Sequence, residues 1–150
     1  MTTSVKNPVA IACIFTWIGF VCAISFMEAW LKFRAPGITL SLGLGIGRLV
    51  FNALNKIEWI LAAGILLDLF ISKKKLLTTG HIALLIPLLL LTVQTLWLLP
   101  ALDARAEAYL QGSAPAPSRL HIYYVSMEAI KVISLFISGI YFFKPSTSSS

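Results

Sequence analysis

Four long apolar stretches constrain this chain more than any other feature of its sequence. The hydrocarbon core of a bilayer is about 30 Å thick, so a helix needs about 20 predominantly apolar residues to cross it. Residues 8–30, 47–71, 79–99 and 120–143 each meet that requirement. Only 12% of the 150 residues are charged, which is about half the share found in soluble domains. We therefore expect an all-α, polytopic membrane protein, folded as an up-down bundle of four transmembrane helices.

The four stretches leave little chain for a second domain. We expect residues 1–145 to form one transmembrane domain and the serine-rich residues 146–150 to be a disordered tail. The first stretch lacks the basic start and the cleavage site of a signal peptide, so we expect it to remain as a helix. Pro100 is expected to end the third helix.

Gly43 and Gly47 precede the second stretch and lie four residues apart. With Gly45 they resemble a nucleotide-binding loop, but no strand precedes them. The spacing instead indicates a close helix contact or a short segment at the membrane interface.

The basic residues gather at the ends of the expected helices and form no basic face, so we expect no nucleic-acid partner and take the lipid bilayer as the main one. In an up-down bundle Lys6, Lys73–Lys75 and Lys144 share one side, and Lys32, Arg34, Arg105 and Arg119 lie on the other. Cytoplasmic loops are enriched in lysine and arginine. The compact Lys73–Lys75 run therefore predicts a multi-pass protein with both termini in the cytoplasm.

Polar residues inside the apolar stretches are costly in lipid and point to function. They follow helical spacing, so each set lies on one face of its helix. The first helix carries Ser25, Glu28 and Lys32, and the second carries Arg48, Asn52, Asn55 and Glu58. The third carries Gln94, and the fourth carries His121, Tyr124, Glu128 and Lys131.

An up-down topology places these sets towards the same side of the membrane. The glutamates can pair with Lys32, Arg48 and Lys131, because a buried charge is tolerated only with partners. We expect a polar, charged cavity in one leaflet that binds or passes a small solute, an ion or a proton. The ligand-binding residues would be Glu28, Lys32, Arg48, Asn52, Asn55, Glu58, His121, Tyr124, Glu128 and Lys131. The alternative is that these pairs only hold the helices together, as in a structural or accessory membrane subunit.

No metal site is expected, because the two histidines begin different helices at opposite membrane faces. His81 begins the third helix and His121 begins the fourth. The sequence also lacks a Ser-His-Asp set and a phosphate-binding loop, so it leaves open whether the protein is an enzyme.

The run Arg48-Leu-Val-Phe-Asn-Ala-Leu-Asn55-Lys-Ile-Glu58-Trp59 resembles the second helix of the MAPEG family. These are four-helix membrane proteins of eicosanoid and glutathione metabolism. The resemblance implies that Arg48, Asn55 and Glu58 contact glutathione, and that Arg105 is catalytic by stabilising its thiolate. Trp59 stands where that family usually has tyrosine, and Glu128 and Lys131 are not part of its pattern.

A second resemblance lies in Lys32-Phe33-Arg34, which is similar to small four-helix membrane families of unassigned function. The leading hypothesis is therefore a binding or transport protein, followed by a MAPEG-like transferase with glutathione as cofactor. A four-helix bundle makes a thin wall, so a homo-oligomer or a partner membrane subunit is a further expectation.

Overall fold

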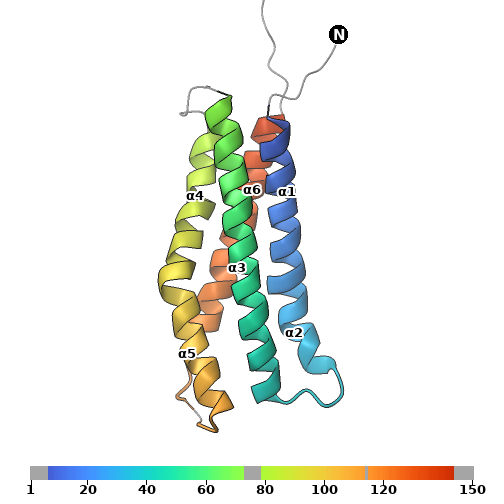
Figure 1. Cartoon of the computed structure of the whole chain (residues 1–150), viewed down its shortest axis with the longest axis vertical. Coiled ribbons are helices and arrows are strands. Elements are labelled where there is room, and N and C mark those ends of the chain that lie inside the picture. Colours follow the sequence, from blue (N-terminus) through green and yellow to red (C-terminus); the bar gives the residue numbers. More distant parts are fainter. Residues whose placement is uncertain (1–6, 73–78, 114, 144–150) are drawn as a thin grey trace, which may run out of the picture.

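The computed structural model describes residues 7–72, 79–113 and 115–143, and within these ranges the protein is all-helical, without a strand. The all-α fold expected from the sequence is confirmed. The described residues form four helical rods that lie side by side (Figure 1). The rods are Pro8–Arg34, α3 (Leu40–Ile71), Thr79–Leu110 and α6 (Leu120–Phe143).

Two of the rods are composite. The first contains α1 (Pro8–Val21), a π-helical segment η1 (Cys22–Glu28), α2 (Ala29–Leu31) and a 3-10 turn η2 (Lys32–Arg34). The third contains α4 (Thr79–Val93), a π-helical segment η3 (Gln94–Leu98) and α5 (Leu99–Leu110). A π-helical turn is wider than an α-helical one and is often found at functional sites.

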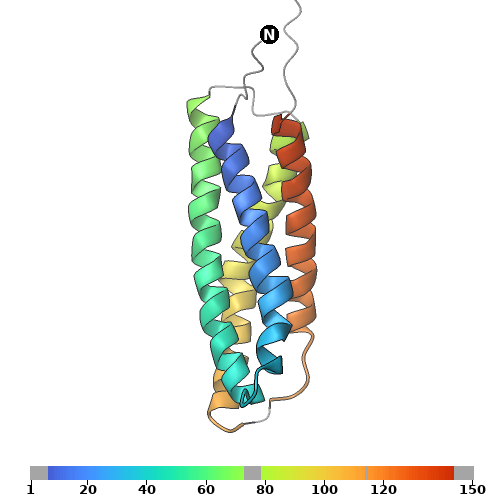
Figure 2. The same ribbon diagram turned by 90° about the vertical axis from the view of Figure 1, so that its right-hand side faces the viewer.

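Successive rods run in alternate directions. One end of the molecule holds the start of α1 and the ends of α3 and α6. We name it the upper end, after its place in Figure 1. The opposite end, where α5 ends and α3 begins, is the lower end. Around the bundle α1 packs against α3 and α6, α4 packs against α6, and α5 packs against α3 (Figure 2).

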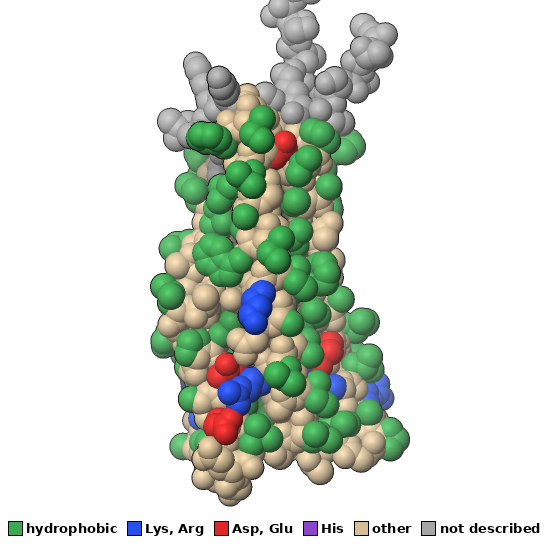
Figure 3. Space-filling view, in the orientation of Figure 1, with side chains coloured by type: hydrophobic (Ala, Val, Ile, Leu, Met, Phe, Trp, Pro, Cys, Tyr) green, Lys and Arg blue, Asp and Glu red, His purple; other side chains and the backbone are tan. Residues whose placement is uncertain are grey.

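Three rods, Pro8–Arg34, Ile82–Leu110 and Leu120–Phe143, are long and apolar enough to cross a membrane. The helix α3 is longer but carries Arg48, Lys56, Glu58 and Asp68. Large apolar side chains are exposed along the bundle, while charged side chains gather towards the lower end of the face shown in Figure 3. Soluble monomers rarely expose apolar surface on this scale.

Pro100 does not end the third helix, contrary to expectation. It lies in the first turn of α5, directly after η3, where the fixed φ of proline is compatible with a helical backbone. The helix ends instead at Leu110. There Gly112 adopts φ +82°, and the N–H groups of Gly112 and Ser113 bond to carbonyls of the last turn.

The second helix begins at Leu40 rather than at Gly47. The Thr39 hydroxyl caps it by accepting a hydrogen bond from the Leu42 N–H at 3.2 Å. Gly43 and Gly47 therefore lie inside a helix, and both are buried. A Cβ at Gly43 would overlap the Phe33 ring, and a Cβ at Gly47 would lie 3.0 Å from Lys32 Nζ. At both positions the missing side chain leaves room for side chains of η2, at the end of the first rod.

The apolar core has two parts. The upper part contains Ile14, Val21, Ile65, Leu91 and Leu135 with their neighbours. The lower part contains Leu98, Leu99 and Tyr124. A layer of buried polar side chains lies between them. The expected disordered tail (residues 146–150) and the Lys73–Lys75 run both lie outside the described residues.

Candidate functional site

The polar layer is a hydrogen-bonded network centred on the ammonium group of Lys131. Lys131 Nζ donates to Glu58 Oε1 at 2.6 Å, to Gln94 Oε1 at 2.5 Å and to Glu128 Oε1 at 2.9 Å. These three bonds use all three ammonium protons. Trp17 Nε1 donates to Glu58 Oε1 at 2.7 Å, and Gln94 Nε2 donates to Glu128 Oε1 at 2.7 Å. All five side chains are buried.

Each of the four rods contributes to this network. Glu128 and Lys131 are three residues apart on α6, so they share a face and pair with each other. Glu58 comes from α3, Trp17 from α1 and Gln94 from the first position of η3. The network therefore joins the rods through charged hydrogen bonds, which are stronger than neutral ones.

The network lies at mid-height of the bundle. Glu58 is ten residues from Arg48 and ten from Asp68, or about 15 Å from each along the helix. Glu58, Glu128 and Lys131 are thus separated along the bundle from the charged residues of the lower end. The prediction from the sequence had placed all of these residues towards one side of the membrane.

Two buried oxygens beside the network have no hydrogen-bond partner among the described residues. They are Ser25 Oγ, in the middle of η1, and Glu128 Oε2. The Tyr124 side chain, one turn below Glu128 on α6, interacts with both residues. Buried polar atoms without partners are uncommon and need an explanation.

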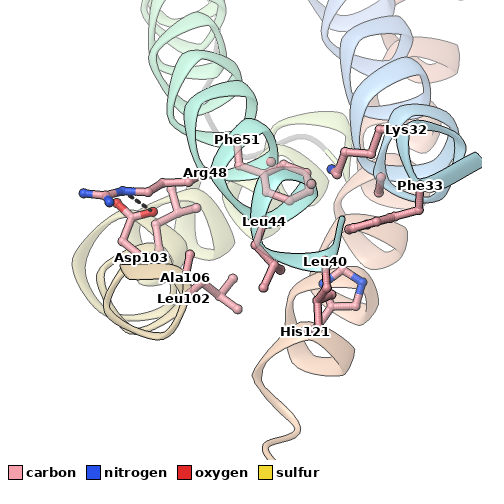
Figure 4. Close-up of a pocket in the computed structure, with 14 residues that line it drawn as sticks. Lys32, Phe33, Leu40, Leu44, Arg48, Phe51, Leu102, Asp103, Ala106 and His121 are labelled. Atoms are coloured by element: carbon pink, nitrogen blue, oxygen red, sulfur yellow. Dashed lines mark ion pairs between the residues drawn. The ribbon is translucent and has the colours of Figure 1, made fainter. Parts of the chain in front are cut away.

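A cavity of about 260 Å³ opens between the rods at the lower end. Its walls are mostly apolar and include Phe33, Leu44, Phe51 and Leu102. Lys32, Arg48, Asp103 and His121 provide its polar groups. Figure 4 shows the Lys32 ammonium pointing inwards, while the Arg48 guanidinium turns away towards Asp103.

Lys32 is held by contacts on several sides. Its Nζ lies 3.1 Å from Glu28 Oε2, one turn earlier. It also lies 5.3 Å from the centre of the Phe51 ring and 5.5 Å from that of Phe33. Both distances are in the range of cation–π attraction. The ammonium therefore lies at the cavity wall with apolar surface around it.

A second cavity of about 220 Å³ adjoins the first, and both are lined by Leu40, Leu44, Leu102, Ala106 and His121. The second cavity adds Arg105, Tyr109 and Ser118. No ion pair is formed by Arg105 with any other residue in the described ranges. The first cavity therefore adjoins a second, also largely apolar one, whose wall includes the guanidinium group of Arg105.

The remaining polar residues of α3 bond to the third rod. Arg48 pairs with Asp103, at 3.8 Å, and with Glu107, not with Glu58. Asn52 Nδ2 donates to both carboxylate oxygens of Asp103, at 3.2 and 3.0 Å.

Thr95 connects α3 to η3 a little higher in the bundle. Its hydroxyl accepts hydrogen bonds from Asn55 Nδ2 at 2.9 Å and from Trp59 Nε1 at 3.0 Å. These bonds join two rods and line neither cavity.

The structure thus distributes the ten expected site residues over several places. Lys32, Arg48 and His121 line the cavity, and Glu28 holds Lys32. Glu58, Glu128 and Lys131 form the network, and Tyr124 borders it. Asn52 and Asn55 join α3 to the third rod. Of the positions implied by the MAPEG resemblance, Arg48 and Arg105 line adjoining cavities, whereas Asn55 and Glu58 line neither.

Some residues of these sites were not in the expected set. Trp17 gave no polar signal, although a tryptophan in the middle of an apolar stretch carries an N–H that needs a partner. Gln94 stood out as the main polar residue of the third stretch. Asp103 and Glu107 lie past Pro100 and are brought to Arg48 only because the helix continues through that proline.

The upper end carries further polar contacts, one of which caps α1. Asp68 Oδ2 accepts a hydrogen bond from the Ala10 N–H at 2.9 Å, which satisfies a free donor in the first turn of α1. Among the described residues, no three His, Cys, Asp or Glu side chains gather in a way that could hold a metal ion.

Comparison of the chain with known protein families, with curated proteins and with solved structures finds no match. The site must therefore be interpreted from its own chemistry.

Proposed function

We propose that the chain is an integral membrane protein of four spanning helices, and that its lower-end cavities bind an amphiphilic anion. Three rods have the length and apolarity to span. For α3, the 21 residues from Arg48 to Asp68 extend over about 30 Å, the thickness of the hydrocarbon core. Its Glu58 is covered by the other rods, which is how charged residues are tolerated in membranes.

The observation that carries the ligand proposal is that two largely apolar cavities adjoin, and that one of them is bordered by Arg105. The first cavity offers aromatic and leucine side chains to an acyl or prenyl chain. The second offers Arg105, Tyr109, Ser118 and His121 to a carboxylate or phosphate head group. An arginine suits such a head group because its guanidinium bonds to two oxygens at once.

Charge at the lower end also favours an anion. The cations there are Lys32, Arg34, Arg48, Arg105 and Arg119, against the carboxylates Glu28, Asp103 and Glu107. This excess attracts an anionic head group from the membrane surface. Each cavity alone is smaller than the roughly 300–1,000 Å³ typical of ligand pockets, so the ligand is expected to occupy both.

Native mass spectrometry of the purified protein tests this proposal. Adducts released from nanodiscs would identify a membrane phospholipid, and adducts formed only after adding palmitate would identify a free fatty acid. The variant Arg105→Gln should lose the adduct. Its control is Arg119→Gln, which removes the same charge from an exposed residue that lines neither cavity. Equal loss of adduct in both variants, or no adduct at all, would contradict the proposal.

A glutathione-dependent transferase is the second candidate, because Arg48 and Arg105 lie at adjoining cavities. Glutathione should then raise the thermal unfolding midpoint of the protein. A ligand at 100 times its Kd stabilises by about 2.7 kcal/mol. This stabilisation by glutathione should be lost in Arg48→Gln. A protein that binds palmitate and shows no change of its unfolding midpoint with glutathione would favour the first candidate.

We also propose that the upper end faces the cytoplasm, on the strength of the Lys73–Lys75 run. The cavities would then open towards the opposite leaflet. Alkaline phosphatase fused after Ser150 should be inactive in a bacterial host, and fused after Gly112 it should be active.

An assembly with a second copy or with a partner subunit is a separate proposal, which cross-linking in membranes would test.

A further inference from the structure

With both of its carboxyl groups ionised, the buried network carries an unbalanced negative charge. Its ionisable members are Glu58, Glu128 and Lys131, all buried, so two carboxylates face one ammonium group. The other described side chains that bond to it, Trp17 and Gln94, are neutral. Charge in the middle of an apolar bundle is costly unless it is paired. One further positive charge would balance the network.

The unmet hydrogen-bonding capacity lies at the same place as the unbalanced charge. Lys131 has already donated its three protons, so it has none left for Glu128 Oε2. That oxygen and Ser25 Oγ lack partners, and the Tyr124 side chain borders both residues. Three oxygen-bearing groups from η1 and α6 therefore lie together, and no cationic side chain among the described residues bonds to Glu128 Oε2.

The local backbone adds an independent observation. Ser25 lies within the π-helical segment η1, and Gln94 begins the π-helical segment η3. The polar layer thus coincides with the irregular part of both composite rods. Membrane proteins that bind ions near mid-height commonly do so at irregular helix segments, where backbone carbonyls are freed.

We infer that Glu128 Oε2, Ser25 Oγ and the Tyr124 hydroxyl form a site for one exchangeable monovalent cation, either Na⁺ or a proton. A divalent ion is disfavoured, because it would overcompensate the charge and Ca²⁺ requires six to eight oxygens. The titratable groups facing Glu128 are Glu58 on α3, and Lys131 and Tyr124 on α6. From α1, η1 and η3, the described side chains beside the network are the uncharged Trp17, Ser25 and Gln94. Glu28, at the end of η1, pairs with Lys32 instead.

The cation site has a short connection to the cavity. Phe51 lines the cavity and packs against Tyr124, with ring centres 4.9 Å apart. One aromatic pair therefore separates the cavity from the cation site. The inference itself stands without the ligand proposed for the cavity, because it rests on the network alone.

The test uses the purified full-length protein in nanodiscs. NaCl replaces choline chloride at constant ionic strength and pH, and the thermal unfolding midpoint is recorded. A saturable rise with Na⁺ identifies the sodium form. For the proton form, infrared difference spectra between two pH values should show a carboxylic acid band. That band should be absent in Glu128→Gln and present in Asp68→Asn, which alters a carboxylate at the upper end.

If Glu128→Gln fails to fold, Ser25→Ala still tests the inference. It removes one oxygen ligand and leaves the ion pairs of Lys131 intact. Losing one oxygen ligand, taken as comparable in strength to a hydrogen bond to a charged group, should raise the half-saturating Na⁺ concentration about tenfold. In the proton form, the carboxyl band should shift in frequency in Ser25→Ala or Tyr124→Phe. No response to either Na⁺ or pH would overturn the inference. So would a response that all of these variants leave unchanged.

Discussion

Replacing Lys131 by methionine should be the most damaging single change in the network. Methionine is close to lysine in volume, so the change removes the charge while keeping most of the packing. Removing one partner of a buried ion pair costs about 3–5 kcal/mol. Here one ammonium serves two carboxylates, at 2.6 and 2.9 Å, and an amide oxygen at 2.5 Å. We therefore expect a loss near the upper value, about 5 kcal/mol.

The free energy of unfolding can be measured by titrating SDS into mixed micelles and following helix content by circular dichroism. A loss of about 5 kcal/mol is large against a total stability of about 5–15 kcal/mol. Lys56→Met is the matched control, since Lys56 is exposed on the same bundle. Its effect should be much smaller, because Lys56 forms no ion pair among the described residues.

A triple variant separates charge from packing. Adding Glu58→Gln and Glu128→Gln to Lys131→Met removes every charge of the network, and neutral replacement of a buried ion pair is often tolerated. The triple variant should therefore be more stable than Lys131→Met alone. If Lys131→Met unfolds at the same SDS fraction as the parent protein, the ammonium does not stabilise the network and the reasoning is refuted.

Three further predictions concern the contacts around the network and at the two ends, all read as free energies of unfolding in the same SDS assay. Gly43→Ala should destabilise the protein by about 1–3 kcal/mol, because the added methyl group would meet the Phe33 ring. The control Gly45→Ala makes only ordinary contacts and should be neutral or stabilise by up to about 1 kcal/mol. Equal effects of the two substitutions would contradict the close contact at Gly43. Trp17→Phe should cost about 1.5–3 kcal/mol through the lost hydrogen bond to a buried carboxylate, and no loss would show that this bond contributes little. Asp68→Ala should cost about 1 kcal/mol by uncapping α1, with less hydrogen-exchange protection confined to the first turn of that helix; unchanged exchange there would argue against capping.

Helical periodicity explains how much of the candidate site was predictable. Glu128 and Lys131 are three residues apart, so their sharing a face of α6 follows from the geometry of one helix. The pairing of Glu28 with Lys32 is local in the same way. The spacing of Gly43 and Gly47 predicted a close neighbour, and the neighbours are the Phe33 and Lys32 side chains of η2.

The partners of Arg48 were not predictable in this way. Its spacing to Glu58 suggested a shared stripe, but Asp103 and Glu107 reach it from the third rod. They do so because the π-helical turn at η3 lets the chain continue through Pro100. No local pattern in the sequence announces such a turn, since proline after a leucine-rich stretch normally marks a helix end.

The sequence by itself therefore determined the apolar, all-helical nature of this protein and the faces that carry polar residues, because both depend on the kinds of residue and their spacing along single helices. The tertiary structure decided which faces meet and at what height. It brought Trp17, Glu58, Gln94 and Lys131 together from four rods and moved this network away from the lower-end cavities. The physical reason is that helix spacing specifies direction around an axis, whereas axial register is decided by packing between helices.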